Sequence, residues 1–198
     1  MIQEFTTVDD LPLPIPWTVH GSKPIYDSRW VSLDLVDVEP TAAERYEHHV
    51  VTVPYEAVCV LVHHPEKGVL LLYRHRFITN TAGFELPAGG VEPGEDVLVA
   101  ASREVLEETG CVVDRLEKVA TGNASDGVST QRFHFVYARA SNEESVPADA
   151  FESDRLYWVP VDSIASLVQA GLVPGCPAMF GLLFGLQFGY FGSNRPAP

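Results

Sequence analysis

Apolar and polar residues alternate along much of the first half of the chain, in the pattern of β-strands. Residues 30–38 alternate as a half-buried strand does, and residues 48–53 form another extended run. Two apolar runs, residues 57–63 and 69–73, flank the turn sequence Pro65-Glu66-Lys67-Gly68. A turn between two such runs predicts a β-hairpin.

Helical spacing of apolar residues first appears at residues 97–109, which end at Gly110. A second helix is predicted at residues 163–170, with Asp162 as its N-cap and Gly171 at its end. Further strands are predicted at residues 116–121, 131–138 and 156–159. Strands and helices in this order predict an α/β fold with a mixed sheet between helices.

The composition is that of a globular protein, with 46% hydrophobic and 20% charged residues. Lysine and arginine number 13 against 27 acidic residues, so the formal net charge is −14. Nucleic-acid backbones and acidic membrane surfaces repel such an anion, and we expect neither as a partner. If the substrate carries phosphates, something local must reverse the sign of the charge, and a bound divalent cation is the obvious candidate.

The cysteines and the N-terminal residues indicate the cellular compartment of the protein. Cys59, Cys111 and Cys176 are widely spaced and have neither a disulfide framework nor zinc-ligand spacing, which favours a reducing compartment. The first ten residues are acidic and do not have the basic and apolar regions of a signal peptide. We therefore expect a cytoplasmic protein.

Chemistry is concentrated in the segment from residue 89 to residue 111. On the predicted helix, Glu104, Glu107 and Glu108 lie three and four positions apart, beside an apolar stripe. Like charges at this spacing destabilise a helix, but carboxylates are good ligands for a hard cation. The alternative is a solvated acidic helix face. The glycine-rich loop before the helix would let its backbone approach a ligand closely.

The whole segment resembles the Nudix box, G-x5-E-x7-R-E-U-x-E-E-x-G-U, in which U is a bulky apolar residue. The matching residues are Gly89, Glu95, Arg103, Glu104, Val105, Glu107, Glu108, Gly110 and Cys111. The sequences L-L-Y-R-H-R (71–76) and F-E-L-P-A-G (84–89) are similar to the ADP-ribose pyrophosphatase branch of that family. The resemblance runs from about Trp30 to about Leu183, and it implies an α/β/α Nudix fold.

The resemblance also implies a metal site. Glu104 and Glu108 would be the principal Mg²⁺ ligands, with Glu107 contributing and the backbone carbonyl of Ala88 as a further ligand. Mn²⁺ could substitute for Mg²⁺. The family implies that the glutamates are oriented by two more residues of the box, Glu95 and Arg103.

Substrate and proton transfer would involve residues outside the box. Arg76 and Glu85 match positions that often contact substrate in this branch, although Arg76 could be an ordinary arginine at a strand end. Glu152 matches the glutamate of the family's D-E-x-I stretch, and we expect it to accept the proton of the attacking water. The alternative is that it belongs to a solvated acidic loop with no role in the reaction. Asp126 stands where the branch usually has proline, so we expect it to contact substrate and alter its choice.

These features predict two regions and one activity. Residues 1–54 would be an irregular arm and a β-rich dimerisation region, and residues 55–198 the Nudix hydrolase domain of a homodimer. The predicted reaction is Mg²⁺-dependent hydrolysis of the diphosphate bond of a nucleoside diphosphate linked to another group, such as ADP-ribose or a nucleotide sugar. Alternatives are a dinucleoside polyphosphate or other nucleotide hydrolase on the same metal site, and a non-catalytic nucleotide sensor.

Overall fold

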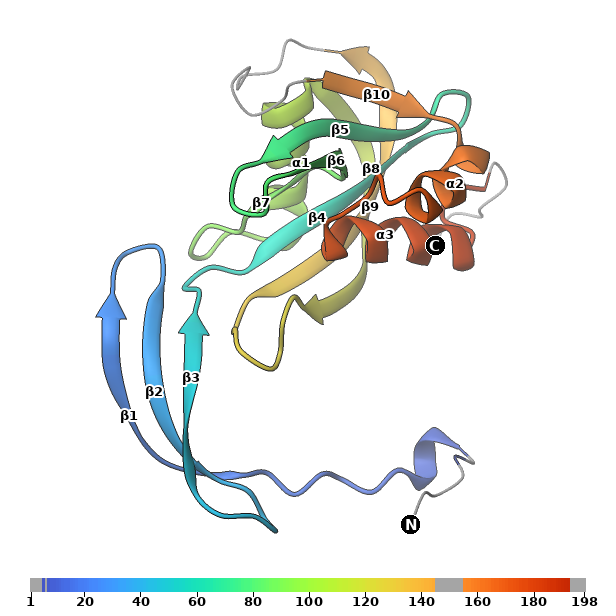
Figure 1. Ribbon diagram of the computed structural model, residues 1–198. Coiled ribbons are helices and arrows are strands. Elements are labelled where there is room, and N and C mark those ends of the chain that lie inside the picture. The colour runs from blue at the N-terminus through green and yellow to red at the C-terminus, as the bar shows by residue number, and fades with distance from the viewer. Residues whose placement is uncertain (1–4, 6, 145–154, 193–198) are drawn as a thin grey trace. The chain divides into compact units, whose positions relative to one another are not determined.

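The computed structural model describes residues 5, 7–144 and 155–192 of the 198-residue chain. By its internal contacts the chain divides into two compact units, Met1–Thr52 and Val53–Pro198 (Figure 1). The first unit contains the short 3₁₀ helix η1 (Val8–Asp10) and an antiparallel sheet in the order β1-β2-β3. Its strands are β1 (Thr18–Asp27), β2 (Ser32–Glu39) and β3 (Tyr46–Thr52).

A serine-centred turn sets the start of β2. The Ser28 hydroxyl accepts hydrogen bonds from the backbone N–H groups of Trp30 and Val31 and donates one to the carbonyl of Val31. The extended run predicted from residue 30 therefore begins two residues later, at Ser32. Strands β2 and β3 then pair without a break, from Ser32 opposite Thr52 to Val38 opposite Tyr46.

The second unit contains a mixed sheet of seven strands among the described residues, with β10-β5-β4-β9-β8 as its main order. The short strands β6 and β7 pair with β5 and β4, and β4 and β9 run parallel. The bounds are β4 (Ala57–His64), β5 (Gly68–Arg76), β6 (Thr81–Glu85), β7 (Ala88–Gly90), β8 (Cys111–Asn123), β9 (Arg132–Glu144) and β10 (Arg155–Val159).

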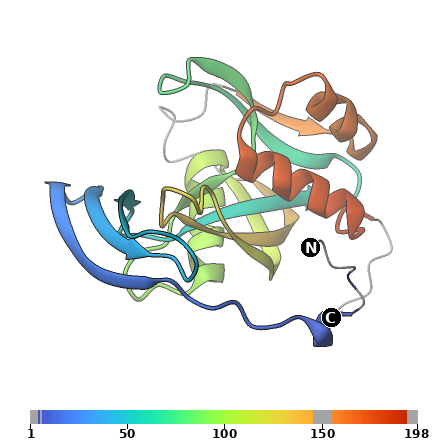
Figure 2. The ribbon, with the colours of Figure 1, turned by 60° about the horizontal axis from the view of Figure 1, so that its bottom comes forward.

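Helices cover both faces of this sheet, as Figures 1 and 2 show. Their bounds are α1 (Val97–Thr109), α2 (Ile164–Gln169) and α3 (Cys176–Gln187), with the 3₁₀ helix η2 (Val161–Ser163) before α2. Alternate residues of β4 supply two cores. Val60 packs in a cluster with Val105 of α1, whereas Leu61 packs in a cluster with Leu182 of α3. The result is the predicted three-layer α/β/α arrangement.

The ends of the helices agree with the sequence prediction in one case and differ in the other. Helix α1 has the predicted bounds, since Asp96 caps its first turn and Gly110 (φ 67°) ends it in the left-handed conformation. The predicted N-cap of the second helix is wrong. Asp162 lies inside η2, and Ser163 stands at the cap of α2 without a capping side-chain bond. None of the helices in the described residues is long and apolar enough to span a membrane.

Candidate active site

The candidate site forms where β7 leads through a short loop into α1. Strand β7 pairs with the start of β4, with Ala88 opposite Cys59 and Gly90 opposite Ala57. The loop residue Glu95 accepts a hydrogen bond from the backbone N–H of Glu92 (3.0 Å), which closes the turn before the helix. Helix α1 then runs back along β7, so that its acidic residues reach the β7 backbone.

Glu104 lies directly against Gly89. A Cβ atom built on Gly89 would stand 2.0 Å from the Glu104 carboxylate, so a side chain at this position would displace that carboxylate. The sequence predicted that the glycine-rich loop would let its backbone approach a ligand, whereas in the structure the group close to Gly89 is Glu104. The absence of a side chain at Gly89 brings a carboxylate of α1 onto the backbone of β7.

Glu108 is buried, and both of its carboxylate oxygens are held. Oε1 accepts from the Arg74 guanidinium at 2.8 Å, and Oε2 accepts from the backbone N–H of Ala88 at 2.9 Å. Burial raises the pKa of Glu108, which the hydrogen bond and positive charge of Arg74 oppose. The nearby charge of Glu104 also raises this pKa.

Arg103 organises the remaining acidic residues of the box. Its guanidinium donates to both oxygens of Glu95 (3.0 Å each) and to the carbonyl of Gly90 (2.9 Å). It also donates to Glu104 at 2.7 Å and to Glu107 at 3.1 Å. Its hydrogen bonds, first that to Glu95, raise the pKa of Arg103, so it stays a cation at any pH at which the protein is folded.

Of the three carboxylates predicted as metal ligands, two converge. Glu104 and Glu108 both reach β7, whereas Glu107, with 46% of its side chain exposed, is turned toward Arg103. Among the described residues, no group of three or more His, Cys, Asp or Glu side chains is arranged to hold a metal ion. The donor chemistry nevertheless suits a hard cation, since two carboxylates lie at one backbone segment and raise the negative charge there.

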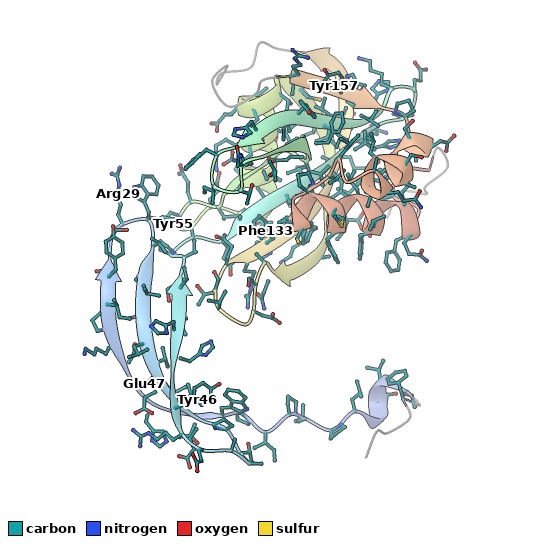
Figure 3. All side chains as sticks on the ribbon, in the orientation of Figure 1. Arg29, Tyr46, Glu47, Tyr55, Phe133 and Tyr157 are labelled. Atoms are coloured by element: carbon teal, nitrogen blue, oxygen red, sulfur yellow. The ribbon has the colours of Figure 1, made fainter. Side chains whose placement is uncertain are left out.

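Two of the predicted substrate residues, Arg76 and Glu85, line a cavity beside these glutamates. Arg76 donates to both oxygens of Glu85, at 2.8 Å and 2.6 Å, and both side chains line a cavity of about 670 Å³ together with Ala88. We call this the Arg76 cavity. A neighbouring cavity of about 330 Å³ shares Arg76 and Ala88 and is also lined by Tyr55 and Phe133, labelled in Figure 3.

One of the predicted substrate residues is not part of this arrangement. Asp126 lies in the exposed turn between β8 and β9 and lines neither the 670 Å³ nor the 330 Å³ cavity. The backbone N–H groups of Val128 and Ser129 donate to the carbonyl of Ser125 and close that turn. Glu152 lies outside the described residues, and its predicted role stays a prediction.

Two interactions of the site were not predicted from the sequence. Arg74, predicted only as part of a motif, binds Glu108 in the buried part of the site. Its position at the end of an apolar run was a signal, because an arginine in such a strand is expected to be partly buried and then needs a carboxylate partner. The second is the pair of Glu56 with His134 (2.5 Å), whose hydrogen bond lowers the pKa of Glu56. Glu56 lines the same 330 Å³ cavity as Ala88 and Gly89.

Comparison with known proteins decides the family. The family model of the NUDIX domain matches residues 53–175, which is most of the second unit. This chain belongs to the Nudix family. This confirms the family that the sequence predicted. It also confirms the predicted activity class, a Nudix hydrolase that acts on pyrophosphate bonds.

Relatives and a solved structure agree with this assignment. A CMP-5'-(N-acetyl-N-hydroxy-3-aminopropyl)phosphonate hydrolase of Streptomyces rubellomurinus is 32% identical, over 87% of this chain and 84% of that protein. An ADP-ribose pyrophosphatase of Bacillus subtilis is 27% identical, over 74% and 80%. The crystal structure of an ADP compounds hydrolase covers 93% of this chain and all of its own, with a TM-score of 0.80 at 19% identity. The last comparison confirms the Nudix fold.

Proposed function

We propose that this Nudix protein hydrolyses, with Mg²⁺, the anhydride bond that joins a nucleoside 5′-phosphate to a second phosphorylated group. The leading substrates are ADP-ribose, which would give AMP and ribose 5-phosphate, and nucleotide sugars. The observation that carries the proposal is that Glu104 and Glu108 reach the same short strand, beside the cavity that Arg76 and Glu85 line.

Each residue of the site has a distinct part in this proposal. Glu104 and Glu108 would hold Mg²⁺, with Glu107 and the Ala88 carbonyl as further ligands. A bound Mg²⁺ neutralises phosphate oxygens, activates the attacking water and stabilises the leaving phosphate. Arg76 would bind a phosphate oxygen once it is released from Glu85. Glu95, through Arg103, would fix the orientation of Glu104 and Glu107.

The proton of the attacking water requires an acceptor within hydrogen-bond reach. We propose Glu152 for this role, on the family resemblance alone. The bond from water oxygen to phosphorus forms as the anhydride P–O bond breaks, so that the electron pair leaves with the second phosphate group. Both products are then phosphomonoesters, or a phosphomonoester and a phosphonate where the second group is a phosphonate.

The relatives suggest the range of substrates to test. One is named for a CMP-phosphonate and another for ADP-ribose, so the base and the second group both vary among similar chains. A panel should contain ADP-ribose, UDP- and ADP-sugars, a cytidylyl phosphonate and a dinucleoside polyphosphate. We expect release of the nucleoside monophosphate from ADP-ribose or a nucleotide sugar with Mg²⁺ or Mn²⁺, and none with a chelator.

Two results would change this proposal. Full turnover in chelator would rule out the metal site. Tight nucleotide binding without turnover of any panel member would favour the alternative of a non-catalytic sensor. Glu108→Gln should lower kcat by about 100-fold or more in protein that is still folded, since a proposed metal ligand is removed. The melting temperature should fall as well, because Arg74 loses its buried partner, so circular dichroism should first show that the variant is folded at the assay temperature.

Asp126 is proposed to influence substrate choice. Its turn has Ser125 at the first position and Asp126 at the second, where proline is well tolerated, so Asp126→Pro should preserve the turn. If Asp126 hydrogen-bonds a sugar hydroxyl, the substitution should shift the ratio of kcat/KM between ADP-ribose and other nucleotide sugars about tenfold toward ADP-ribose. An unchanged ratio across the panel would show that this turn does not contact substrate.

A further inference from the structure

Arg74 places a positive charge inside the fold. It lies on β5 directly after buried leucines and Tyr73, and only 7% of its side chain is exposed. A guanidinium is costly to bury unless carboxylates compensate its charge. Two carboxylates do so, because Arg74 donates to Glu108 at 2.8 Å, and its Nε lies 3.6 Å from Glu85.

The contact with Glu108 fixes a carboxylate that the proposed reaction needs. One oxygen is held by Arg74 on β5 and the other by the Ala88 amide on β7, so the plane of the carboxylate is set from two strands. A glutamate on a helix otherwise turns freely about its terminal bond. A carboxylate oxygen has two lone pairs, so an oxygen that accepts one hydrogen bond can also bind a cation.

Glu85 extends this arrangement into the Arg76 cavity. Its carboxylate receives Arg76 from the exposed side, at 2.6 Å, and faces Arg74 on the buried side. Charges therefore alternate from the cavity inward, in the order Arg76, Glu85, Arg74 and Glu108. The substrate arginine of the proposed function is thus joined by three ion pairs to the innermost proposed metal ligand.

We propose that Arg74 is a positioning residue of the hydrolytic site. It acts through Glu108, whose carboxylate it aims at the metal, and Glu85 ties this pair to Arg76. The proposal rests on the proposed function in one respect, namely that Glu108 is a metal ligand. A purely structural arginine would stabilise the fold and leave the metal affinity of the folded protein unchanged.

The test compares Arg74→Gln, Arg74→Lys and a matched control. Arg139→Gln removes an arginine of the same sheet that binds Asp114 through two bonds of 2.8 Å, but at the surface. The readouts are Mn²⁺ binding by calorimetry without substrate, kcat and KM on the best substrate, and the melting temperature. Mn²⁺ binding reports on Glu108 whether or not turnover occurs.

We expect Arg74→Gln to weaken Mn²⁺ binding and lower kcat, each by about 10-fold or more, with KM changed less than about threefold. Arg74→Lys keeps a charge and one donor, so it should recover part of both losses. Arg139→Gln should leave both unchanged. In a Glu108→Gln background, Arg74→Gln should add no further loss, because a positioning residue has nothing left to act on.

Three results would overturn the inference. One is Arg74→Gln with normal Mn²⁺ binding and kcat. Another is a drop in melting temperature for both Arg74 variants while the folded protein binds Mn²⁺ normally. The third is an additive loss in the double variant. By contrast, wild-type protein that neither binds Mn²⁺ nor hydrolyses the panel would reject the proposed function itself, and the inference with it.

Discussion

Gly89 and Gly90 are neighbours on β7 but differ in what surrounds them. A methyl group on Gly89 would collide with the Glu104 carboxylate, whereas one on Gly90 would meet no atom within 4 Å. We therefore expect Gly89→Ala to displace Glu104 and lower both Mn²⁺ affinity and kcat, the latter by about 100-fold. Gly90→Ala is the control and should keep the metal affinity of wild type. Equal effects of the two substitutions would contradict the role assigned to the contact.

Glu95 should make stability depend on pH. Its hydrogen bond with Arg103, and next that from the Glu92 amide, hold the pKa of Glu95 below its ordinary value of 4.5. A lowered pKa stabilises the fold above that ordinary value, and the gain is lost as the pH falls through the folded value. The difference in unfolding free energy between wild type and Glu95→Gln should thus be full at pH 7 and shrink toward pH 3.

Chemical denaturation at pH 7, 5 and 3 measures this difference. Glu66→Gln, in the β4–β5 turn, is a suitable control because no described interaction involves its side chain. A wild-type to Glu95→Gln difference that is the same at all three values would contradict the assignment.

Among single residues, the sequence predicted the site residues that lie close to one another along the chain. Glu95, Arg103, Glu104 and Glu108 lie within one loop and one helix, so a short motif fixes their chemistry. Arg74 could not be assigned in this way, because its contact with Glu108 spans 34 positions and depends on how α1 packs against the sheet. The same holds for Glu56 and His134, which are 78 positions apart.

Among the secondary-structure elements, helix α1 has its N-terminus capped by the side chain of Asp96. The Asp96 carboxylate accepts from the backbone N–H of Leu98 (2.8 Å) and of Val99 (3.4 Å). Asp96→Ala should lower the unfolding free energy by about 1 kcal/mol. Asp162→Ala is the control, because Asp162 lies within η2 and no side-chain cap is formed there. Chemical denaturation should give a change for the control within about 0.5 kcal/mol. Equal losses would show that the cap contributes nothing specific.

The elements differ in how far the sequence predicted them. Helix α1 was predicted to the residue because a turn sequence, an apolar stripe at helical spacing and a glycine stop agree with one another. The strands β6 and β7 were not predicted. Each is five residues or fewer, and their strand character comes from pairing with β5 and β4 rather than from alternation of their own. The strands β8 and β9 were predicted too short, since their pairing continues past the apolar stretches.

For the molecule as a whole, the net charge and the local charge both oppose binding of an anionic substrate. A protein of charge −14 repels a polyphosphate at a distance. The candidate site would add to this repulsion, because Glu104 and Glu108 are the residues that we propose lie nearest the phosphates. Among the described residues, Arg76 is the cationic side chain that lines the Arg76 cavity, and it is already paired with Glu85. A bound divalent cation would make binding of such a substrate favourable, which supports the metal dependence we propose.

The oligomeric state is the last prediction, and it concerns the first unit. Residues of its sheet and of the segments beside it expose large apolar side chains, and these are Trp17, Val19, Ile25, Tyr26, Trp30 and Tyr46. Together with the family resemblance, this exposure leads us to expect a homodimer that buries them. Light scattering at micromolar concentration should give twice the 21.7 kDa mass of one chain.

Substitution can locate the interface of this predicted dimer. Val19 and Ile25 both lie on β1, at an edge of the three-stranded sheet, so Val19→Lys with Ile25→Lys should shift the mass toward that of a monomer. Phe188→Lys is the matched control, because Phe188 is an equally exposed apolar residue that follows α3 in the second unit. The control should leave the mass unchanged. A monomeric wild type would reject the dimer. A shift caused by Phe188→Lys alone would place the interface on the second unit instead.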